Sequence, residues 1–79
     1  MTEKQIFRRM NEAYEIEYGE DSSDEWFGED SPEIWRFYRP SKETEYKMVM
    51  DQPNKKVNFF YKKKDDSEFH RSGCYSWKR

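Results

Sequence analysis

The clearest pattern along the chain is a regular alternation of apolar and polar side chains in residues 44–64. In the first half of this stretch the apolar side chains are Tyr46, Met48 and Met50. In the second half they are Val57, Phe59 and Tyr61. A period of two is that of a half-buried β-strand. The residues between the halves, Asp51-Gln52-Pro53-Asn54, have turn chemistry, so we predict an antiparallel hairpin.

A different period marks the N-terminal stretch. Thr2 and Gln5 have the spacing of a capping box, which predicts the start of a helix. Apolar residues then recur every three or four positions and form one stripe: Ile6, Phe7, Met10, Ala13, Tyr14 and Tyr18. Gly19 is suited to end the helix in the left-handed conformation. We therefore expect a helix over about residues 3–18 that covers the hairpin, which is unstable in water without a third layer.

The remaining segments are less clear. Ser31-Pro32-Glu33 is typical of a helix start, but residues 34–39 are rich in strand formers. Trp35 and Phe37 alternate with Arg36 and Tyr38, which favours a strand. After a polar turn at 65–68, spaced aromatics predict a last strand with a bulge at Gly73: Phe69, Tyr75 and Trp77.

The predicted fold class is α+β, with an N-terminal helix packed on a three- or four-stranded antiparallel β-meander. The chain is expected to form one small domain over residues 1–79, with the helix at about 3–18, an acidic loop at 20–33 and the sheet at about 34–78. A domain of 79 residues buries a modest share of its surface, and 41% of its residues are charged. Its aromatic content of 19% supplies most of the core. We expect marginal stability that a partner or a homodimer would raise.

Charge is unevenly distributed. Residues 1–35 hold 11 acidic and 3 basic side chains, a net charge of −8, whereas residues 36–79 hold 6 acidic and 12 basic ones, a net charge of +6. Mutual attraction of the two halves within the fold is one explanation. A recognition surface on one half is the other.

The acidic segment 20–33 holds seven carboxylates around Trp26 and Phe27 and no basic residue. Dense like charge predicts an extended or weakly structured loop. Either the two aromatic side chains fold back onto the core, or they are exposed anchors for a partner protein with a basic surface. On the second interpretation the partner-binding residues are Asp24, Glu25, Trp26, Phe27, Glu29 and Asp30. The protein would then be a small inhibitor or adaptor of the type that phages and mobile elements encode, with carboxylates that imitate nucleic-acid phosphates.

The alternative is binding of single-stranded nucleic acid by the basic second strand of the hairpin. Its candidate residues are Asn58, Phe60, Lys62 and Lys64. An exposed aromatic ring flanked by lysines suits stacking onto bases. A pI of about 5.4 argues against a general phosphate binder, and lysines that protect an edge strand explain the same pattern.

Catalytic and metal chemistry is not indicated. The acidic segment lacks the residue order of a calcium loop, and one histidine with one cysteine does not make a zinc site. His70 and Cys74 are too far apart along one strand to act as a catalytic pair. We expect no enzyme activity, no cofactor and no metal. The absence of any long apolar run predicts a cytoplasmic protein that does not enter the membrane.

Overall fold

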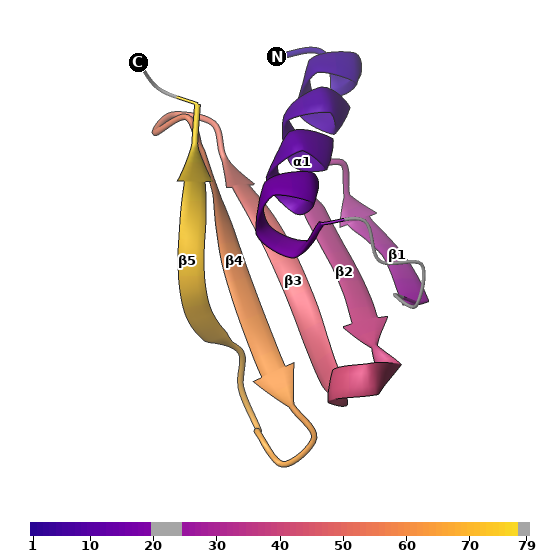
Figure 1. Ribbon diagram of the computed structural model, residues 1–79. Coiled ribbons are helices and arrows are strands. Elements are labelled where there is room, and N and C mark those ends of the chain that lie inside the picture. The colour runs from indigo at the N-terminus through magenta and orange to yellow at the C-terminus, as the bar shows by residue number, and fades with distance from the viewer. Residues whose placement is uncertain (20–24, 78–79) are drawn as a thin grey trace.

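The computed structural model describes the backbone of residues 1–19 and 25–77 and the side chains of residues 1–19 and 31–77. The elements, in chain order, are α1 (Glu3–Tyr18), β1 (Glu25–Ser31), β2 (Ile34–Arg39), the short 3₁₀ helix η1 (Pro40–Lys42), β3 (Thr44–Asp51), β4 (Lys56–Lys63) and β5 (His70–Ser76). The strands form one antiparallel sheet in the order β1-β2-β3-β4-β5, against which α1 lies (Figure 1). The predicted α+β meander is confirmed, and with β1 the sheet has five strands instead of the three or four that the sequence indicated.

The capping box predicted for α1 is present. The backbone N–H of Gln5 donates to Thr2 Oγ1 at 3.2 Å, and the backbone N–H of Thr2 donates to Gln5 Oε1 at 2.9 Å. Gly19 follows the helix with φ +73° and ψ −167°, and its N–H donates to the carbonyl of Glu15. The positive φ explains the glycine, but its ψ differs from the left-handed conformation that we predicted.

The apolar stripe of α1 is narrower than predicted. Ile6, Met10, Ala13 and Tyr14 are buried, whereas Phe7 is 57% exposed. Its ring still lies 5.6 Å from the ring of Trp35. Adjacent positions on a helix are about 100° apart, so Phe7 lies at the border of the contact surface rather than within it.

Residues 34–39 form β2, as the alternation of Trp35 and Phe37 with polar residues favoured. Both aromatic side chains are buried and pair with residues of β3, Trp35 with Met48 and Phe37 with Tyr46. The competing helix-start signature belongs to a turn, because Ser31 Oγ accepts a hydrogen bond from the backbone N–H of Glu33 at 3.3 Å.

The central hairpin of β3 and β4 has the predicted turn chemistry. Asp51 accepts hydrogen bonds from the backbone and the side chain of Asn54, and Lys55 completes the turn with a φ of +52°. The register aligns Met48 with Phe59, so the apolar positions of both strands share one face.

The last predicted strand is present as β5, and its pairing with β4 is irregular. Phe59 pairs with Gly73 and Phe60 with Arg71, which leaves Ser72 as the extra residue of a bulge. The bulge was predicted at Gly73 and lies one residue earlier.

The acidic loop predicted at 20–33 is wrong from Glu25 to Ser31, where the chain forms β1. β1 pairs with β2 from Glu25↔Tyr38 to Ser31↔Ile34, with two register shifts. The prediction considered only repulsion within the segment. It left out the backbone N–H and C=O groups along the edge of β2, which offer this segment a ladder of hydrogen bonds.

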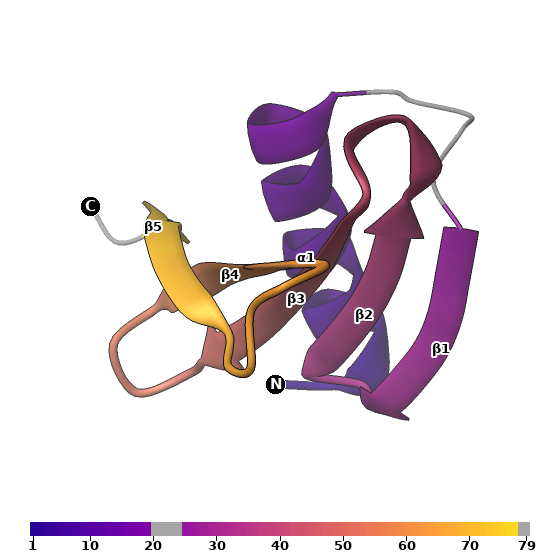
Figure 2. The ribbon, with the colours of Figure 1, turned by 90° about the horizontal axis from the view of Figure 1, so that it is seen from below.

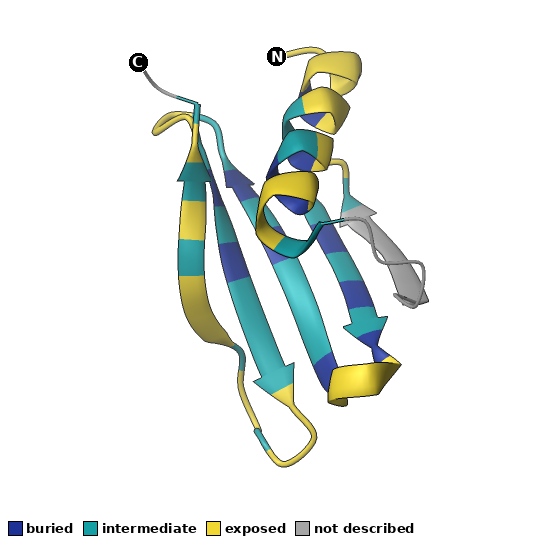
Figure 3. Cartoon of the chain, in the orientation of Figure 1, coloured by how far each residue is buried: buried dark blue, intermediate teal, exposed yellow. Residues whose placement is uncertain are grey.

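The sheet has two unlike faces. The first face contacts α1 and holds the core, as the blue segments in Figure 3 show, and Figure 2 shows α1 on that side of the curved sheet. β3 and β4 extend beyond the last turn of α1 (Figure 1). The buried core comprises Ile6, Met10, Ala13, Tyr14, Trp35, Phe37, Met48, Met50, Val57 and Phe59. We call the opposite side the open face, because within residues 1–19 and 25–77 no helix or strand packs over it.

Candidate binding surfaces

The open face carries a cluster of aromatic rings and cations at its centre. Lys47 Nζ lies 5.6 Å from the ring centre of Phe60 and 4.7 Å from that of Phe69. Lys62 Nζ lies 5.4 Å from the same Phe69 ring. Lys47 and Phe60 are directly paired across β3 and β4, so the sheet register brings them together. We call these four residues the aromatic–lysine cluster.

Two polar contacts border this cluster. Lys62 Nζ lies 3.7 Å from a carboxylate oxygen of Glu45, and Arg71 donates a hydrogen bond of 3.1 Å to Asn58 Oδ1. The pair between Lys62 and Glu45 is half-exposed, so its contribution to stability is small, about 0–1 kcal/mol. These contacts hold the long side chains along the sheet without burying their charge.

Three of the four residues predicted for nucleic-acid binding meet on the open face: Asn58, Phe60 and Lys62. Lys64 lies just beyond β4 and lines a separate shallow hollow of about 270 Å³ with Lys62 and Lys63. The sequence interpretation missed three members of the surface, Lys47, Phe69 and Arg71. The alternation in β3 had placed Lys47 on the polar face, and the hairpin register then aligns it with Phe60.

The residues predicted for partner binding are only partly covered by the structure. Asp24 lies outside the described residues. The backbone of the other five belongs to β1, at one edge of the sheet, and their side chains lie outside the described residues: Glu25, Trp26, Phe27, Glu29 and Asp30.

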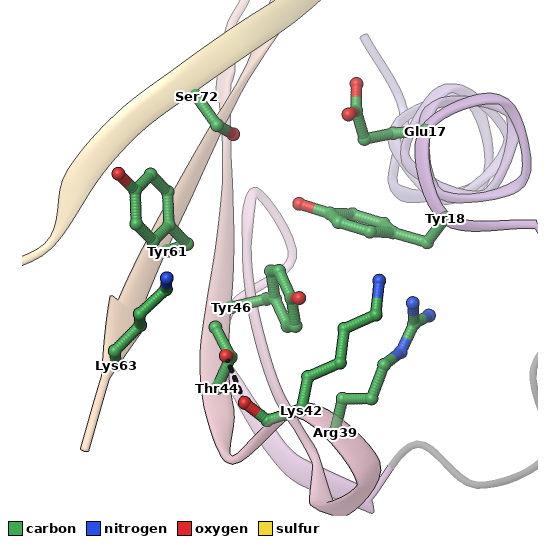
Figure 4. A pocket seen from close by; sticks show the side chains of 9 residues that line it. All are labelled: Glu17, Tyr18, Arg39, Lys42, Thr44, Tyr46, Tyr61, Lys63 and Ser72. Carbon is green, nitrogen blue, oxygen red and sulfur yellow. Dashed lines mark hydrogen bonds between the residues drawn. The ribbon is translucent and has the colours of Figure 1, made fainter.

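The structure also reveals a hollow that the sequence did not indicate, at the end of α1 and on the helix-covered side of the sheet. Its volume is about 580 Å³, and Figure 4 shows side chains from α1, η1 and the strands β2, β3, β4 and β5 around it. We call it the tyrosine–lysine pocket. It is lined by Glu17, Tyr18, Arg39, Lys42, Thr44, Tyr46, Tyr61, Lys63 and Ser72.

His70 and Cys74 point to opposite faces of the sheet by their register, since His70 pairs with Tyr61 and Cys74 with Asn58. In the part of the chain whose side chains are described, no group of three or more histidine, cysteine, aspartate or glutamate residues could hold a metal ion. None of the described helices has the length and apolar character needed to cross a membrane.

Together, the fold and its surfaces define a small α+β domain with one helix-covered and one open sheet face. Comparison of the chain with protein-family models, with curated proteins and with solved structures finds no match.

Proposed function

We propose that this protein is a non-enzymatic binding domain whose open face binds single-stranded nucleic acid. The observation that supports this proposal is the aromatic–lysine cluster, in which the ammonium group of Lys47 lies within about 6 Å of the rings of both Phe60 and Phe69. Proteins that bind single strands without base specificity combine aromatic rings, on which bases stack, with cations that contact phosphates. Both kinds of group lie together on a sheet surface that no described helix or strand covers.

The local charge of the open face favours a polyanion, although the whole chain has a net charge of −2. The alternation of β2 to β5 places five cations and two carboxylates on this face: Arg36, Lys47, Lys56, Lys62 and Arg71, with Glu45 and Asp51. Charges on exposed surfaces are screened beyond a Debye length of about 8 Å at physiological salt. β1, the acidic edge strand, lies two and three strand spacings of about 4.8 Å from β3 and β4, so a strand bound over β3 and β4 interacts mainly with the side chains of those strands.

In the proposed complex, bases stack on the rings of Phe60 and Phe69 and the ammonium groups of Lys47 and Lys62 move from the rings to phosphate oxygens. The cation–π contacts that these lysines give up are weak at an exposed site, about 0.5–1 kcal/mol each. Stacking of a base on an aromatic side chain contributes about 1–3 kcal/mol, so the exchange is favourable.

The test is fluorescence anisotropy of a labelled single strand of about 15 thymidine or uridine nucleotides. Phe60→Ala is expected to weaken binding about 5- to 160-fold, which corresponds to the loss of one stacked base worth about 1–3 kcal/mol. Lys47→Ala is expected to weaken binding and to reduce its salt dependence by about one phosphate contact.

Phe7→Ala is the matched control, because Phe7 is an exposed phenylalanine on α1, away from the open face. Circular dichroism verifies that each variant is folded. The proposal fails if the unmodified protein shows no salt-dependent binding, or if Phe60→Ala and Phe7→Ala bind equally well.

A second candidate function is recognition of a basic partner protein by the acidic segment. It is favoured by the position of that segment, which forms the edge strand β1 rather than a loop. An edge strand can pair with a strand of a partner, and the acidic residues would steer the encounter. In this proposal the protein is a cytoplasmic inhibitor or adaptor that blocks a basic or nucleic-acid-binding surface.

Affinity capture with and without nuclease separates the two functions. A stoichiometric protein partner that survives nuclease, is lost with Trp26→Ala/Phe27→Ala and is retained with Phe60→Ala would support the second function. A partner that is lost on nuclease treatment would instead have been held by nucleic acid and would contradict it.

A further inference from the structure

The tyrosine–lysine pocket lies on the side of the sheet opposite the aromatic–lysine cluster, and its position follows from where α1 ends along the sheet. α1 ends at Tyr18, whereas β3 and β4 continue past the last turn of the helix (Figure 1). The α1 helix does not cover the sheet there (Figure 1), and Lys42 of η1 lines one side of the hollow (Figure 4). The resulting volume of about 580 Å³ lies within the range of small-molecule sites, about 300–1000 Å³.

Among the residues that the structure describes, the lining of the pocket has a positive net charge. Three of these lining side chains are cations, Arg39, Lys42 and Lys63, and one is a carboxylate, Glu17. In Figure 4 the ammonium groups of Lys42 and Lys63 approach the hollow from opposite sides. Within residues 1–19 and 31–77, neither ammonium group takes part in an ion pair. Two cations that face one hollow without an ion-pair partner among these residues favour an anionic ligand.

The floor of the pocket is aromatic and is held in place by the core. The rings of Tyr18 and Tyr46 meet edge to face at 5.1 Å, and Tyr18 also contacts Phe37 and Phe59. The guanidinium of Arg39 lies 5.9 Å from the Tyr18 ring and 5.7 Å from the Tyr46 ring, and Arg39 is only 6% exposed. This part of the pocket is therefore formed before any ligand arrives.

The neighbouring strand β4 adds a third ring to the pocket, and further hydroxyl groups line it. Tyr61 is the direct partner of Tyr46 across β3 and β4, so the two side chains lie side by side on the sheet (Figure 4), and the Tyr61 ring packs against His70 at 5.4 Å. Thr44 and Ser72 also line the hollow, although the Thr44 hydroxyl donates to the carbonyl of Lys42 at 2.7 Å. Tyrosine rings provide apolar area with polar tips, which suits a ligand that is both planar and charged.

We propose that this pocket binds a mononucleotide, a phosphate monoester carried on a sugar with an aromatic base. The phosphate lies between Lys42 and Lys63, which approach it from both sides. The base packs against the rings of Tyr46 and Tyr61, and the carboxylate of Glu17 accepts hydrogen bonds from ribose hydroxyls. A phosphate monoester carries about −1.5 to −2 charges at pH 7, which matches the net charge of +2 on the lining side chains. An inorganic phosphate would satisfy the cations but leave the aromatic walls unused.

This site is independent of the nucleic-acid site proposed on the open face, since the two use different residues on opposite sides of the sheet. The test is isothermal titration calorimetry of the full chain with adenosine 5′-monophosphate, inorganic phosphate and adenosine. The double variant Lys42→Ala/Lys63→Ala is compared with Lys4→Ala, which removes an exposed cation at the other end of α1. Phe60→Ala serves as the control for the open face.

Saturable binding of the nucleotide is expected, and binding of phosphate or adenosine is expected to be at least about 10-fold weaker, a difference of 1.4 kcal/mol. The double variant should weaken nucleotide binding by at least about 10-fold, and Lys4→Ala and Phe60→Ala should leave it unchanged. The proposal is overturned if the nucleotide does not bind at about 5 mM, if phosphate binds as tightly as the nucleotide, or if the double variant behaves like Lys4→Ala.

Discussion

Phe59 and Phe60 are consecutive phenylalanines of β4 with opposite surroundings. Phe59 is 1% exposed beneath α1 and pairs with Met48, whereas Phe60 is half-buried on the open face and pairs with Lys47. Their side chains are chemically identical, so the pleat of the strand alone decides which one belongs to the core. The comparison shows that aromatic content does not measure core size in this chain, because part of it lies on the open face among cations.

The largest effect expected from this comparison is the difference between Phe59→Ala and Phe60→Ala. Phe59→Ala should lower the free energy of unfolding by about 3–5 kcal/mol, because it leaves a cavity between the sheet and α1. Phe60→Ala should lower it by about 1 kcal/mol or less, because its ring is already in partial contact with water. Urea denaturation monitored by circular dichroism measures both. Equal losses would show that the open face is covered in solution.

A smaller effect is expected at the contact that joins β5 to α1. The hydroxyl of Tyr75 donates to Glu12 Oε2 at 3.1 Å, and loss of this bond in Tyr75→Phe should cost about 1 kcal/mol. Burial, together with the hydrogen bond to Glu12 and its charge, raises the pKa of Tyr75 above its ordinary value.

The raised pKa of Tyr75 has a predictable sign in alkaline solution. The folded state holds the hydroxyl proton of Tyr75 more tightly than the unfolded chain does. The stabilisation that this gives the fold is therefore complete below about pH 10, and it is lost as the pH rises through the folded-state pKa. The free energy of unfolding is measured for the natural protein and for Tyr75→Phe between about pH 8 and 11.5. The difference between the two values should become smaller as the pH rises. A constant difference would contradict the coupling.

On the open face, Lys47→Met tests the aromatic–lysine cluster itself. Methionine keeps much of the aliphatic stem and removes the charge that lies over Phe60 and Phe69. The expected loss is about 0.5–1 kcal/mol, measured by urea denaturation. Lys4→Met is the control for removal of a lysine charge elsewhere, and similar results for both variants would show that the cation–π geometry contributes nothing.

The smallest effect is expected at the β4–β5 turn. Asp66 accepts a hydrogen bond from the backbone N–H of Lys63 at 3.0 Å. This bond is the main cause that lowers the pKa of the Asp66 carboxyl group, and the nearby His70 lowers it further. A lowered pKa stabilises the fold above the unfolded-state value and ceases to do so as the pH falls through the folded-state value. Asp66→Asn should therefore lower the midpoint of urea unfolding slightly at pH 7 and not at about pH 2. An equal change at both pH values would contradict this.

Local patterns predicted most of the architecture. The capping box placed the start of α1, the alternation in residues 44–64 predicted the central hairpin, and Trp35 with Phe37 favoured β2 over a helix. The prediction failed for β1, whose residues Glu25–Ser31 carry no period and repel one another. Pairing with β2 supplies hydrogen bonds that a local pattern does not contain.

The candidate sites also divide into residues that a local pattern predicted and residues that only the fold brings together. Asn58, Phe60 and Lys62 were predicted because they alternate along one strand, and Lys47 followed once the hairpin register was known. The tyrosine–lysine pocket could not be predicted, because its residues extend from Glu17 to Ser72 and share no sequence pattern. They meet only because β3 and β4 continue past the last turn of α1 (Figure 1) and Lys42 of η1 lies beside the part of the sheet that the helix leaves uncovered.

The sequence by itself determined which residues form α1 and the strands β2 to β5, because capping, turn chemistry and side-chain period act over a few residues. Only the tertiary structure decided that the acidic segment becomes an edge strand, that Lys47 and Phe69 join Phe60, and that cations and tyrosines surround a pocket at the end of α1. Those outcomes depend on contacts between distant parts of the chain, whose energies arise only when sheet and helix have assembled.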